Sequence, residues 1–318
     1  MLRTLALAVL LAVAPLASPA FAAWPERPVK ILIGYAPGGS TDVVARLIQP
    51  KLQEKLGQPV IIENKPGGAG DYAAELMLQA PADGYTLMMS TVALHAINPG
   101  MYKQKFDPVE DFAPIAFVCS YPMIMIGSPQ TTFRTPSDLA QQSMANPMFY
   151  SSSGVGSPGH LAGELLVRST DAKLTHVPYK GGAPSVFAII SGEAQVNFAT
   201  LPAVVPQIRA GKVRAIALAS RQRNPAVPDV PTMEESGLKD FDVGTWSGLI
   251  GPKSLPPDIV RKVNDAVAFA VNDPAIQKRL LDEGTEIRTM SPQEFGTFIR
   301  AENARWVKVV REAGIRPQ

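Results

Sequence analysis

The stretch "VKILIGYAPGGSTDVVARLI" (Val29–Ile48) joins a short apolar run to a helical pattern through a Pro-Gly-Gly loop. Val29–Tyr35 is rich in β-forming residues and predicts a buried strand. Thr41–Leu56 carries apolar residues at helical spacing and is closed by Gly57, which predicts a helix. A buried strand that passes through a tight loop into a helix is the first half of a βαβ unit. This stretch therefore predicts an α/β fold with a parallel sheet.

The alternation of strands and helices continues along the chain. Val60–Glu63 and Tyr85–Ser90 predict two more strands, with a helix at Asp71–Gln79 between them. A second series begins further on, ends in a predicted strand at Ala215–Ser220, and is followed by a helical tail.

Two longer apolar segments separate these series. Phe112–Pro129 is broken by Pro122, and we expect two strand segments there. Val243–Pro252 is the second segment. At each of them we expect the chain to leave one sheet and enter another.

The crossing segments predict two domains. Residues 23–121 and 245–318 would form a discontinuous first domain around an inserted second domain, residues 122–244. Ligands of open α/β sheets bind at the carboxyl ends of the strands. Two mainly parallel sheets that face each other across a hinge would therefore make a ligand cleft.

The first 22 residues have the pattern of a secretory signal peptide. Arg3 precedes the apolar run Leu5–Ala14, and Ala20-Phe21-Ala22 matches a cleavage motif, so we predict cleavage after Ala22. A membrane anchor is the alternative, but the run is shorter than the roughly 20 residues that a spanning helix needs. We therefore expect an exported protein, most simply in a bacterial periplasm. We also expect it to be a monomer.

The composition excludes several classes of protein. The chain has 30 basic and 28 acidic residues, which argues against a nucleic-acid partner because phosphate binding needs clustered Lys and Arg. Cys119 is the only cysteine, so an internal disulfide framework is excluded. His95, His160 and His176 are not at metal-ligand spacing, and we expect neither a metal nor a cofactor.

The loop Pro37–Asp42 is a candidate anion site. The free N–H groups and the dipole of the helix that starts here attract anions, and Gly38 and Gly39 let the backbone approach a ligand closely. The loop lacks both G-x-G-x-x-G and the Lys-Ser/Thr of a P-loop, so it is not a nucleotide fingerprint. An ordinary tight turn is the alternative, and we expect Asp42 to be a helix cap or an early-turn acid.

Three further loops suit the same role. Hydroxyls and glycines dominate residues 151–160, glycines follow a lysine in residues 179–185, and residues 90–95 end a strand and should face the cleft. Another glycine loop, residues 64–70, could line the cleft, but we favour a simple turn. The candidate binding residues are Gly38, Gly39, Ser40, Thr41, Ser90, Thr91, Val92, Leu94, Ser152, Ser153, Gly154, Gly156, Ser157, Lys180, Gly181 and Gly182.

The sequence gives catalysis little support. A serine hydrolase would show G-x-S-x-G, and Val155 stands where the glycine before Ser157 should be. A convergent triad is recognised by geometry and stays open, with Ser157 and His160 as its candidates. We expect no catalytic residue and no enzymatic activity.

Seven segments match one known family in the right order. They are "YAPGGSTDVVARL", "GQPVIIENKPGGAG", "APADGYTL", "SSGVGSPGHLAGELL", "HVPYKGGAPS", "QIRAGKVRAIA" and "PDVPTMEESG". Over nearly the whole mature chain, the sequence resembles the tripartite tricarboxylate transporter substrate-binding receptors, also called Bug-type solute receptors. The resemblance implies a two-domain, type II periplasmic binding protein fold that closes around a small organic carboxylate.

The resemblance also implies roles for particular loops. Main-chain N–H groups, hydroxyls and waters at Gly38–Thr41 and Ser152–Ser157 would hold the carboxylate. The far end of the ligand would meet Ser90–Leu94, Lys180–Gly182, and Ala199 with Thr200.

The sequence departs from the family pattern at two places. Ala199 stands where many relatives have an acid, which removes a partner for a ligand ammonium group. Val92, Ala93 and Leu94 replace residues that are commonly small and polar. We therefore expect a ligand without a free amine, an aromatic or aliphatic mono- or dicarboxylate, with specificity set at Val92–Leu94 and Ala199.

Three functions are compatible with these observations. The first is a solute receptor that delivers its ligand to the membrane subunits of a transporter. The second is a ligand-sensing receptor for a membrane signalling protein, whose binding site would look the same. The third is a periplasmic hydrolase.

Overall fold

The computed structural model describes residues 24–316 of the chain. The predicted signal peptide, residues 1–22, lies outside the described residues. Within residues 24–316, no helix combines the length and the apolar character that crossing a bilayer requires.

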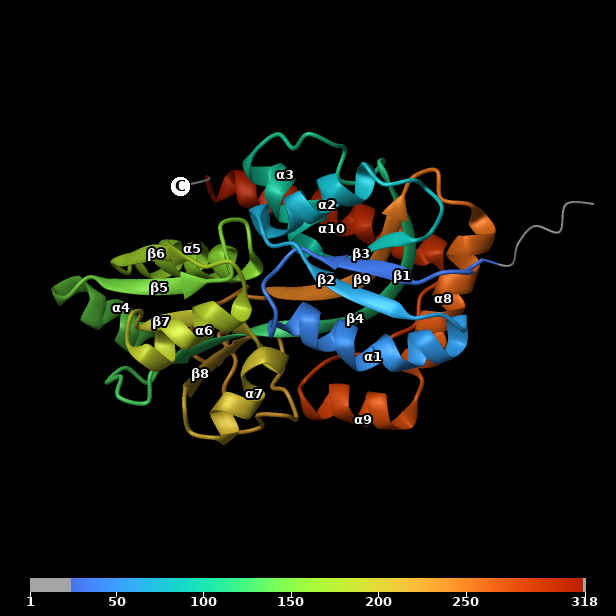
Figure 1. Ribbon diagram of the computed structural model, residues 1–318. Helices are drawn as coiled ribbons and strands as arrows, with labels where there is room; N and C mark the ends of the chain where they lie inside the picture. The colour runs from blue at the N-terminus through green and yellow to red at the C-terminus, as the bar shows by residue number, and fades with distance from the viewer. Residues whose placement is uncertain (1–23, 317–318) are drawn as a thin grey trace, which may run out of the picture.

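Strands and helices alternate along the described chain, and Figure 1 labels them. The strands are β1 (Val29–Ile33), β2 (Val60–Asn64), β3 (Thr86–Thr91), β4 (Phe112–Gly127), β5 (Met148–Ser152), β6 (Leu174–Pro178), β7 (Val196–Thr200), β8 (Arg214–Ala219) and β9 (Gly244–Pro252). The helices are α1 (Ser40–Leu56), α2 (Asp71–Leu78), α3 (Asn98–Met101), α4 (Pro136–Ala145), α5 (Pro158–Thr170), α6 (Gly182–Ser191), α7 (Leu201–Arg209), α8 (Pro257–Val271), α9 (Pro274–Asp282) and α10 (Pro292–Glu312), with short turns η1 (Gly68–Gly70) and η2 (Ala93–Ile97).

The nine strands of the described chain form one curled sheet in the order β2-β1-β3-β9-β4-β7-β5-β6, with β8 also paired to β4. β1 is parallel to β2 and β3, and β5 is parallel to β6 and β7. β9 runs antiparallel to β3 and β4, and β4 runs antiparallel to β7 and β8. The predicted α/β fold is confirmed: two sets of parallel strands are joined through the crossing strands β4 and β9.

The first crossing segment is one continuous strand, so the prediction of two segments broken at Pro122 was wrong. β4 pairs with β9 as far as Pro122, opposite Gly244, and pairs with β7 and β8 from Met123 onward. The N–H of Met123 donates to Val243 at 3.1 Å, directly after the proline. Proline lacks an N–H, and it interrupts little here because the strand exchanges one partner for another at this position.

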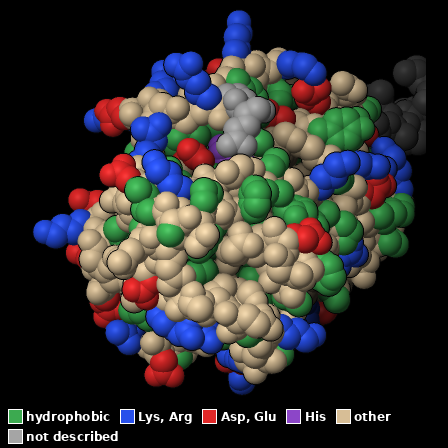
Figure 2. Space-filling view, turned by 90° about the vertical axis from the view of Figure 1, so that its left-hand side faces the viewer, with side chains coloured by type: hydrophobic (Ala, Val, Ile, Leu, Met, Phe, Trp, Pro, Cys, Tyr) green, Lys and Arg blue, Asp and Glu red, His purple; other side chains and the backbone are tan. Residues whose placement is uncertain are grey.

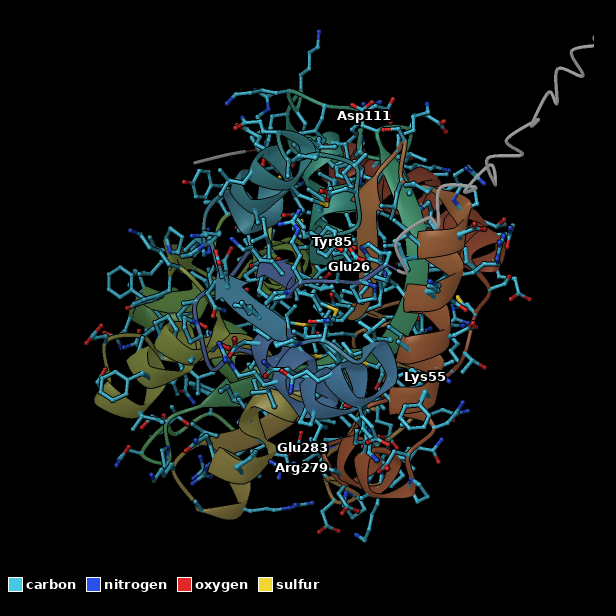
Figure 3. All side chains as sticks on the ribbon, turned by 45° about the vertical axis from the view of Figure 1, so that its right-hand side comes forward. Glu26, Lys55, Tyr85, Asp111, Arg279 and Glu283 are labelled. Carbon is cyan, nitrogen blue, oxygen red and sulfur yellow. The ribbon has the colours of Figure 1, made fainter. Side chains whose placement is uncertain are left out.

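Helices cover both faces of the β1, β3 and β9 region (Figure 1). On the face of α1 and α8, Ile31, Ile48 and Val267 belong to one apolar core. On the face of α2 and α10, Trp246 and Phe295 pack edge to face with ring centroids 5.5 Å apart. Figure 3 shows the α1 and α8 face, where the two helices pack side by side.

Figure 2 views the molecule from the side of β5, β6 and α4. Acidic and basic side chains are interspersed around this face, and neutral and hydrophobic side chains fill its centre. The described part of this face therefore carries no concentrated basic patch of the kind that binds nucleic acid.

Candidate functional site

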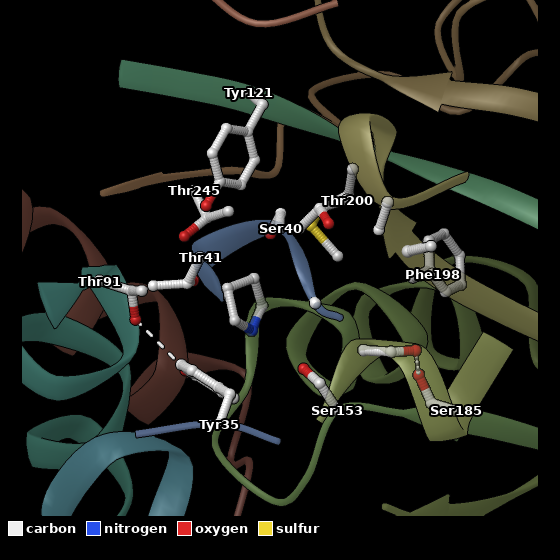
Figure 4. A pocket seen from close by; sticks show the side chains of 16 residues that line it. Tyr35, Ser40, Thr41, Thr91, Tyr121, Ser153, Ser185, Phe198, Thr200 and Thr245 are labelled. Atoms are coloured by element: carbon white, nitrogen blue, oxygen red, sulfur yellow. Dashed lines mark hydrogen bonds between the residues drawn. The ribbon is translucent and has the colours of Figure 1, made fainter. Parts of the chain in front are cut away.

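A small cavity lies where β1, β3, β5 and β7 end, between the two sets of parallel strands. Its volume is about 40 Å³. Its walls are formed by Tyr35, Gly39, Ser40, Thr41, Thr91, Tyr121, Met123, Ser153, Pro158, Gly182, Ser185, Phe198, Ala199, Thr200, Ala203 and Thr245 (Figure 4).

Four helices begin at this cavity. Ser40 starts α1, Pro158 starts α5, Gly182 starts α6, and Thr200 is the N-cap of α7. The N–H groups of a helix's first turn have no acceptor within the helix, and its dipole places positive charge at that end. None of the lining residues is Asp, Glu, Lys, Arg or His. The cavity is therefore suited to an anion and offers no carboxylate to a cation.

Asp42 fixes the loop that leads into α1. Its carboxylate accepts hydrogen bonds from the N–H of Gly38 at 2.9 Å, from Arg46 Nε at 3.0 Å and from Asn64 Nδ2 at 3.0 Å. Burial alone would raise the pKa of Asp42, but these hydrogen bonds outweigh burial and hold the pKa below its ordinary value. Asp42 is thus an early-turn acid that shapes the loop while Gly39, the N-cap, carries no side-chain cap.

The floor of the cavity comes from the crossing strands. Tyr121 on β4 lies opposite Thr245 on β9, and Met123 follows two residues after Tyr121 on the same face. The Tyr121 hydroxyl lies 2.8 Å from Ser247 Oγ, and burial raises the pKa of Tyr121 to about 12. The floor therefore presents neutral hydroxyl and thioether groups.

Tyr35 closes the side of the cavity next to β3. Its hydroxyl donates to the carbonyl of Ala69 at 3.1 Å and lies 3.2 Å from Thr91 Oγ1. Burial raises the pKa of Tyr35 well above its ordinary value, so this hydroxyl is also neutral.

The structure brings part of the predicted set to the cavity. The predicted residues that line it are Gly39, Ser40, Thr41, Thr91, Ser153, Gly182, Ala199 and Thr200. The predicted residues outside the lining are Gly38, Ser90, Val92, Leu94, Ser152, Gly154, Gly156, Ser157, Lys180 and Gly181. Residues 64–70, for which a simple turn was favoured, do not line it either.

The segment after β3 is not a loop. The chain passes from Thr91 directly into the helical turns η2 and α3. Val92 and Leu94 are fully buried in an apolar core, and the Ser90 hydroxyl donates to the carbonyl of Gly248 at 3.1 Å. Their side chains therefore face the protein interior and do not reach the cavity wall.

In the second predicted loop, residues 151–160, most polar groups form hydrogen bonds within the loop or with His176. Ser157 Oγ accepts the N–H of His160 at 3.2 Å and caps α5, and Ser152 Oγ lies 2.7 Å from His176 Nε2. The N–H of Gly156 donates to His160 Nδ1 at 3.3 Å, and burial lowers the pKa of His160 to about 4. These contacts fix the loop and leave Ser153 and Pro158 as its contribution to the cavity.

Lys180 and Gly181 meet the first loop instead of the cavity. The N–H of Ala36 donates to the carbonyl of Lys180 at 2.9 Å. A side chain at Gly181 would place its Cβ 2.9 Å from the Ala36 nitrogen, so glycine permits this contact between the two halves of the molecule.

The described residues show neither a metal cluster nor a histidine in the cavity. No group of three or more His, Cys, Asp or Glu within residues 24–316 could hold a metal ion. His160 and His176 stack with ring centroids 4.2 Å apart, and His95 stacks on Trp246 at 5.7 Å, all of them outside the cavity lining.

Sequence comparison gives the family. The model of the tripartite tricarboxylate transporter family receptor matches residues 44–315. Protein BugT of Bordetella pertussis is 32% identical over 326 residues, which cover 99% of this chain and 99% of BugT.

Solved structures of similar proteins support the same family assignment. The periplasmic binding protein BugD is 31% identical, with a TM-score of 0.89 over 92% of this chain and 100% of BugD. MatC from Rhodopseudomonas palustris, with bound malate, is 33% identical, with a TM-score of 0.86 over 90% of this chain and 100% of MatC. Rpa4515 from R. palustris, with adipate, is 34% identical, with a TM-score of 0.88 over 93% of this chain and 100% of that protein.

The family and these structures are solute receptors with a periplasmic binding protein fold, and they are not enzymes. The chain therefore belongs to the tripartite tricarboxylate transporter receptor family, as its motifs indicate, and it is a binding protein of the Bug type.

Proposed function

We propose that this protein captures a small organic carboxylate in the cavity and delivers it to the membrane subunits of a tripartite tricarboxylate-type transporter. The observation that supports the proposal most directly is the convergence of four helix N-termini on a cavity without a charged side chain. Helix N-termini attract anions, and here no lining acid opposes that attraction.

The ligand lacks a free amine in this proposal. An ammonium group would lie among helix N-termini without a carboxylate partner, and Ala199 supplies only a methyl group. Met123, Phe198 and Ala203 provide apolar contact for the carbon part of the acid. Malate in MatC and adipate in Rpa4515 are acids of this amine-free class.

Closure of two domains around the ligand is part of the proposal. The proposed boundary between residues 121 and 122 lies one residue before the position where β4 exchanges β9 for β7 and β8. The hydrogen bond from Ala36 to Lys180 links the two proposed domains beside the cavity. We propose that ligand binding stabilises this contact.

Thermal shift and calorimetry on residues 23–318 test the proposal. Adipate, malate, benzoate and phthalate form the test panel, and aspartate and glutamate form the amine-bearing control. At a hundredfold excess over Kd, a bound acid should raise the free energy of unfolding by about 2.7 kcal/mol. No response to any carboxylate would overturn the proposal. Tight aspartate or glutamate binding without a response to the panel would overturn the amine-free ligand alone.

Export to the periplasm, cleavage after Ala22 and a monomeric state complete the proposal. BugD, a periplasmic binding protein, supports the compartment. Mass spectrometry of protein from a periplasmic extract should find a chain that begins at Ala23, and light scattering should give the mass of one copy. A full-length chain in the membrane fraction would contradict the cleavage.

A pull-down with and without the bound acid tests the partner. Capture of transporter membrane subunits supports delivery. Capture of a membrane signalling protein instead would replace delivery by sensing.

A further inference from the structure

Thr245 occupies a special position in the cavity floor. It lies on β9 directly opposite Tyr121 of β4, so the two side chains share one face of the sheet. Figure 4 shows Thr245 beside Tyr121 and Thr41 at the cavity wall. Thr41 belongs to the first turn of α1, where an anion is favoured.

The hydroxyl of Thr245 has no hydrogen-bond partner among the described residues, although the residue is only 6% exposed. The neighbouring hydroxyls are engaged: Tyr121 with Ser247, and Tyr35 with Ala69 and Thr91. Buried polar groups in folded proteins are nearly always paired, because an unpaired group loses its hydration without compensation. An unpaired buried hydroxyl in a cavity wall therefore points to a ligand.

We infer that Thr245 is a ligand-binding residue whose hydroxyl donates a hydrogen bond to a carboxylate oxygen of the ligand, an inference that rests on the proposed function. Position favours this role, since Thr245 stands beside the first turn of α1 and faces no lining acid. The inferred ligand is an organic acid that places a carboxylate oxygen at the floor and its carbon chain toward Met123 and Phe198.

The test is the isosteric substitution Thr245→Val, which keeps the shape of the side chain and removes the hydroxyl. We expect the Kd for the panel acid that wild type binds best to rise roughly tenfold, the effect of one lost hydrogen bond. We expect the melting temperature of the ligand-free variant to equal or exceed that of wild type, because no protein partner is lost.

Thr285→Val is the matched control. Thr285 is 2% exposed, and its hydroxyl also has no partner among the described residues, but it does not line the cavity. This variant should bind the acid with the wild-type Kd. Thr245→Ser, which keeps a hydroxyl, should restore most of the affinity that Thr245→Val loses.

The outcomes separate the two proposals. Wild-type affinity in Thr245→Val, or a lowered ligand-free melting temperature rescued by Thr245→Ser, overturns the role of Thr245 and leaves the carboxylate receptor intact. Equal losses of affinity in Thr245→Val and Thr285→Val also overturn that role, because the loss would then follow from the removal of any buried hydroxyl and not from a contact with the ligand. A wild-type protein that responds to no carboxylate overturns the proposed function and this inference together.

Discussion

The β1–α1 loop and the β5–α5 loop both lead from a strand through glycines and hydroxyls into a helix, yet they present different groups to the cavity. The first loop contributes three consecutive residues to the wall, Gly39, Ser40 and Thr41. The second contributes Ser153 and Pro158.

Capping explains the difference. α1 has a glycine N-cap without a side-chain hydrogen bond, and its acid Asp42 turns back onto the loop at Gly38. α5 begins with Ser157, which satisfies the N–H of His160, and with Pro158, which has no N–H to donate. The start of α1 therefore keeps more N–H donors for a ligand than the start of α5 does.

Removal of the anchor of the first loop should have the largest effect. Asp42→Ala leaves Gly38 and Asn64 without their acceptor and Arg46 without its ion pair. We expect the free energy of unfolding to fall by about 3 kcal/mol; because Arg46 is half-exposed, solvent screens its ion pair, and this value already takes the screening into account. We expect the affinity to fall by more than about tenfold. Urea denaturation and calorimetry measure the two effects.

Asp138→Ala is the control for this change. Asp138 accepts the N–H groups of Arg134 and Thr135 at the start of α4, away from the cavity. It should lower stability and leave the affinity unchanged. Unchanged affinity in Asp42→Ala would break the proposed link between the loop anchor and the ligand.

The next largest effect on stability should come from acid, which protonates His160 in the second loop. Burial lowers the pKa of His160 from 6.5 to about 4, so the unfolded chain takes up this proton first as the pH falls. The stability contributed by neutral His160 is therefore complete above pH 6.5 and is lost as the pH falls toward 4. The pKa of Asp42 is lowered from 3.8, so the first anchor stays ionised through this window.

The measurement is the free energy of unfolding between pH 6.5 and 4. Wild type should lose about 2 kcal/mol more than His160→Gln over this range. Equal pH slopes in the two proteins would contradict the role of His160.

Loss of the second cap should have a smaller effect. Ser157→Ala removes the acceptor of the His160 N–H at 3.2 Å and should cost about 1 kcal/mol of stability. The affinity should stay within about threefold of wild type. A change of that size is smaller than the loss expected when one hydrogen bond to the ligand is removed. A large loss of affinity at unchanged stability would place Ser157 in the binding site and remove the contrast between the loops.

Removal of the Lys180 side chain should have the smallest effect. Lys180 is exposed, and its carbonyl, not its ammonium group, accepts the N–H of Ala36. Calorimetry at low salt should find the affinity of Lys180→Ala within about twofold of wild type, as for an exposed side chain without a special contact. A tenfold loss would show that the ammonium group reaches the ligand.

Local sequence patterns were sufficient to predict the α/β fold. The strand predicted at Val60–Glu63 and the helix predicted at Thr41–Leu56 follow from apolar spacing and stop signals, which depend only on near neighbours. The passage of β4 through Pro122 depends on which strands lie on either side, and no local pattern contains that information.

The cavity residues were harder to predict from the sequence for the same reason. Tyr121 and Thr245 meet only through the register of two strands that are distant in the chain. Val92 and Leu94 were expected at the cleft because they follow a strand end, but apolar residues in that position suit a core equally well. The continuation of β3 into η2 decides between the two, and it is a matter of tertiary packing.

The continuous strand β4 has a mechanical consequence. Within the described residues, the chain passes between the two sets of parallel strands only along β4 and at the start of β9, which form a paired antiparallel ribbon. Two-stranded ribbons carry a larger twist than wide sheets do, so we expect the proposed closure to change the twist of this ribbon. The resistance of this ribbon to that change would then contribute to how long an acid stays bound, in addition to the groups that touch it.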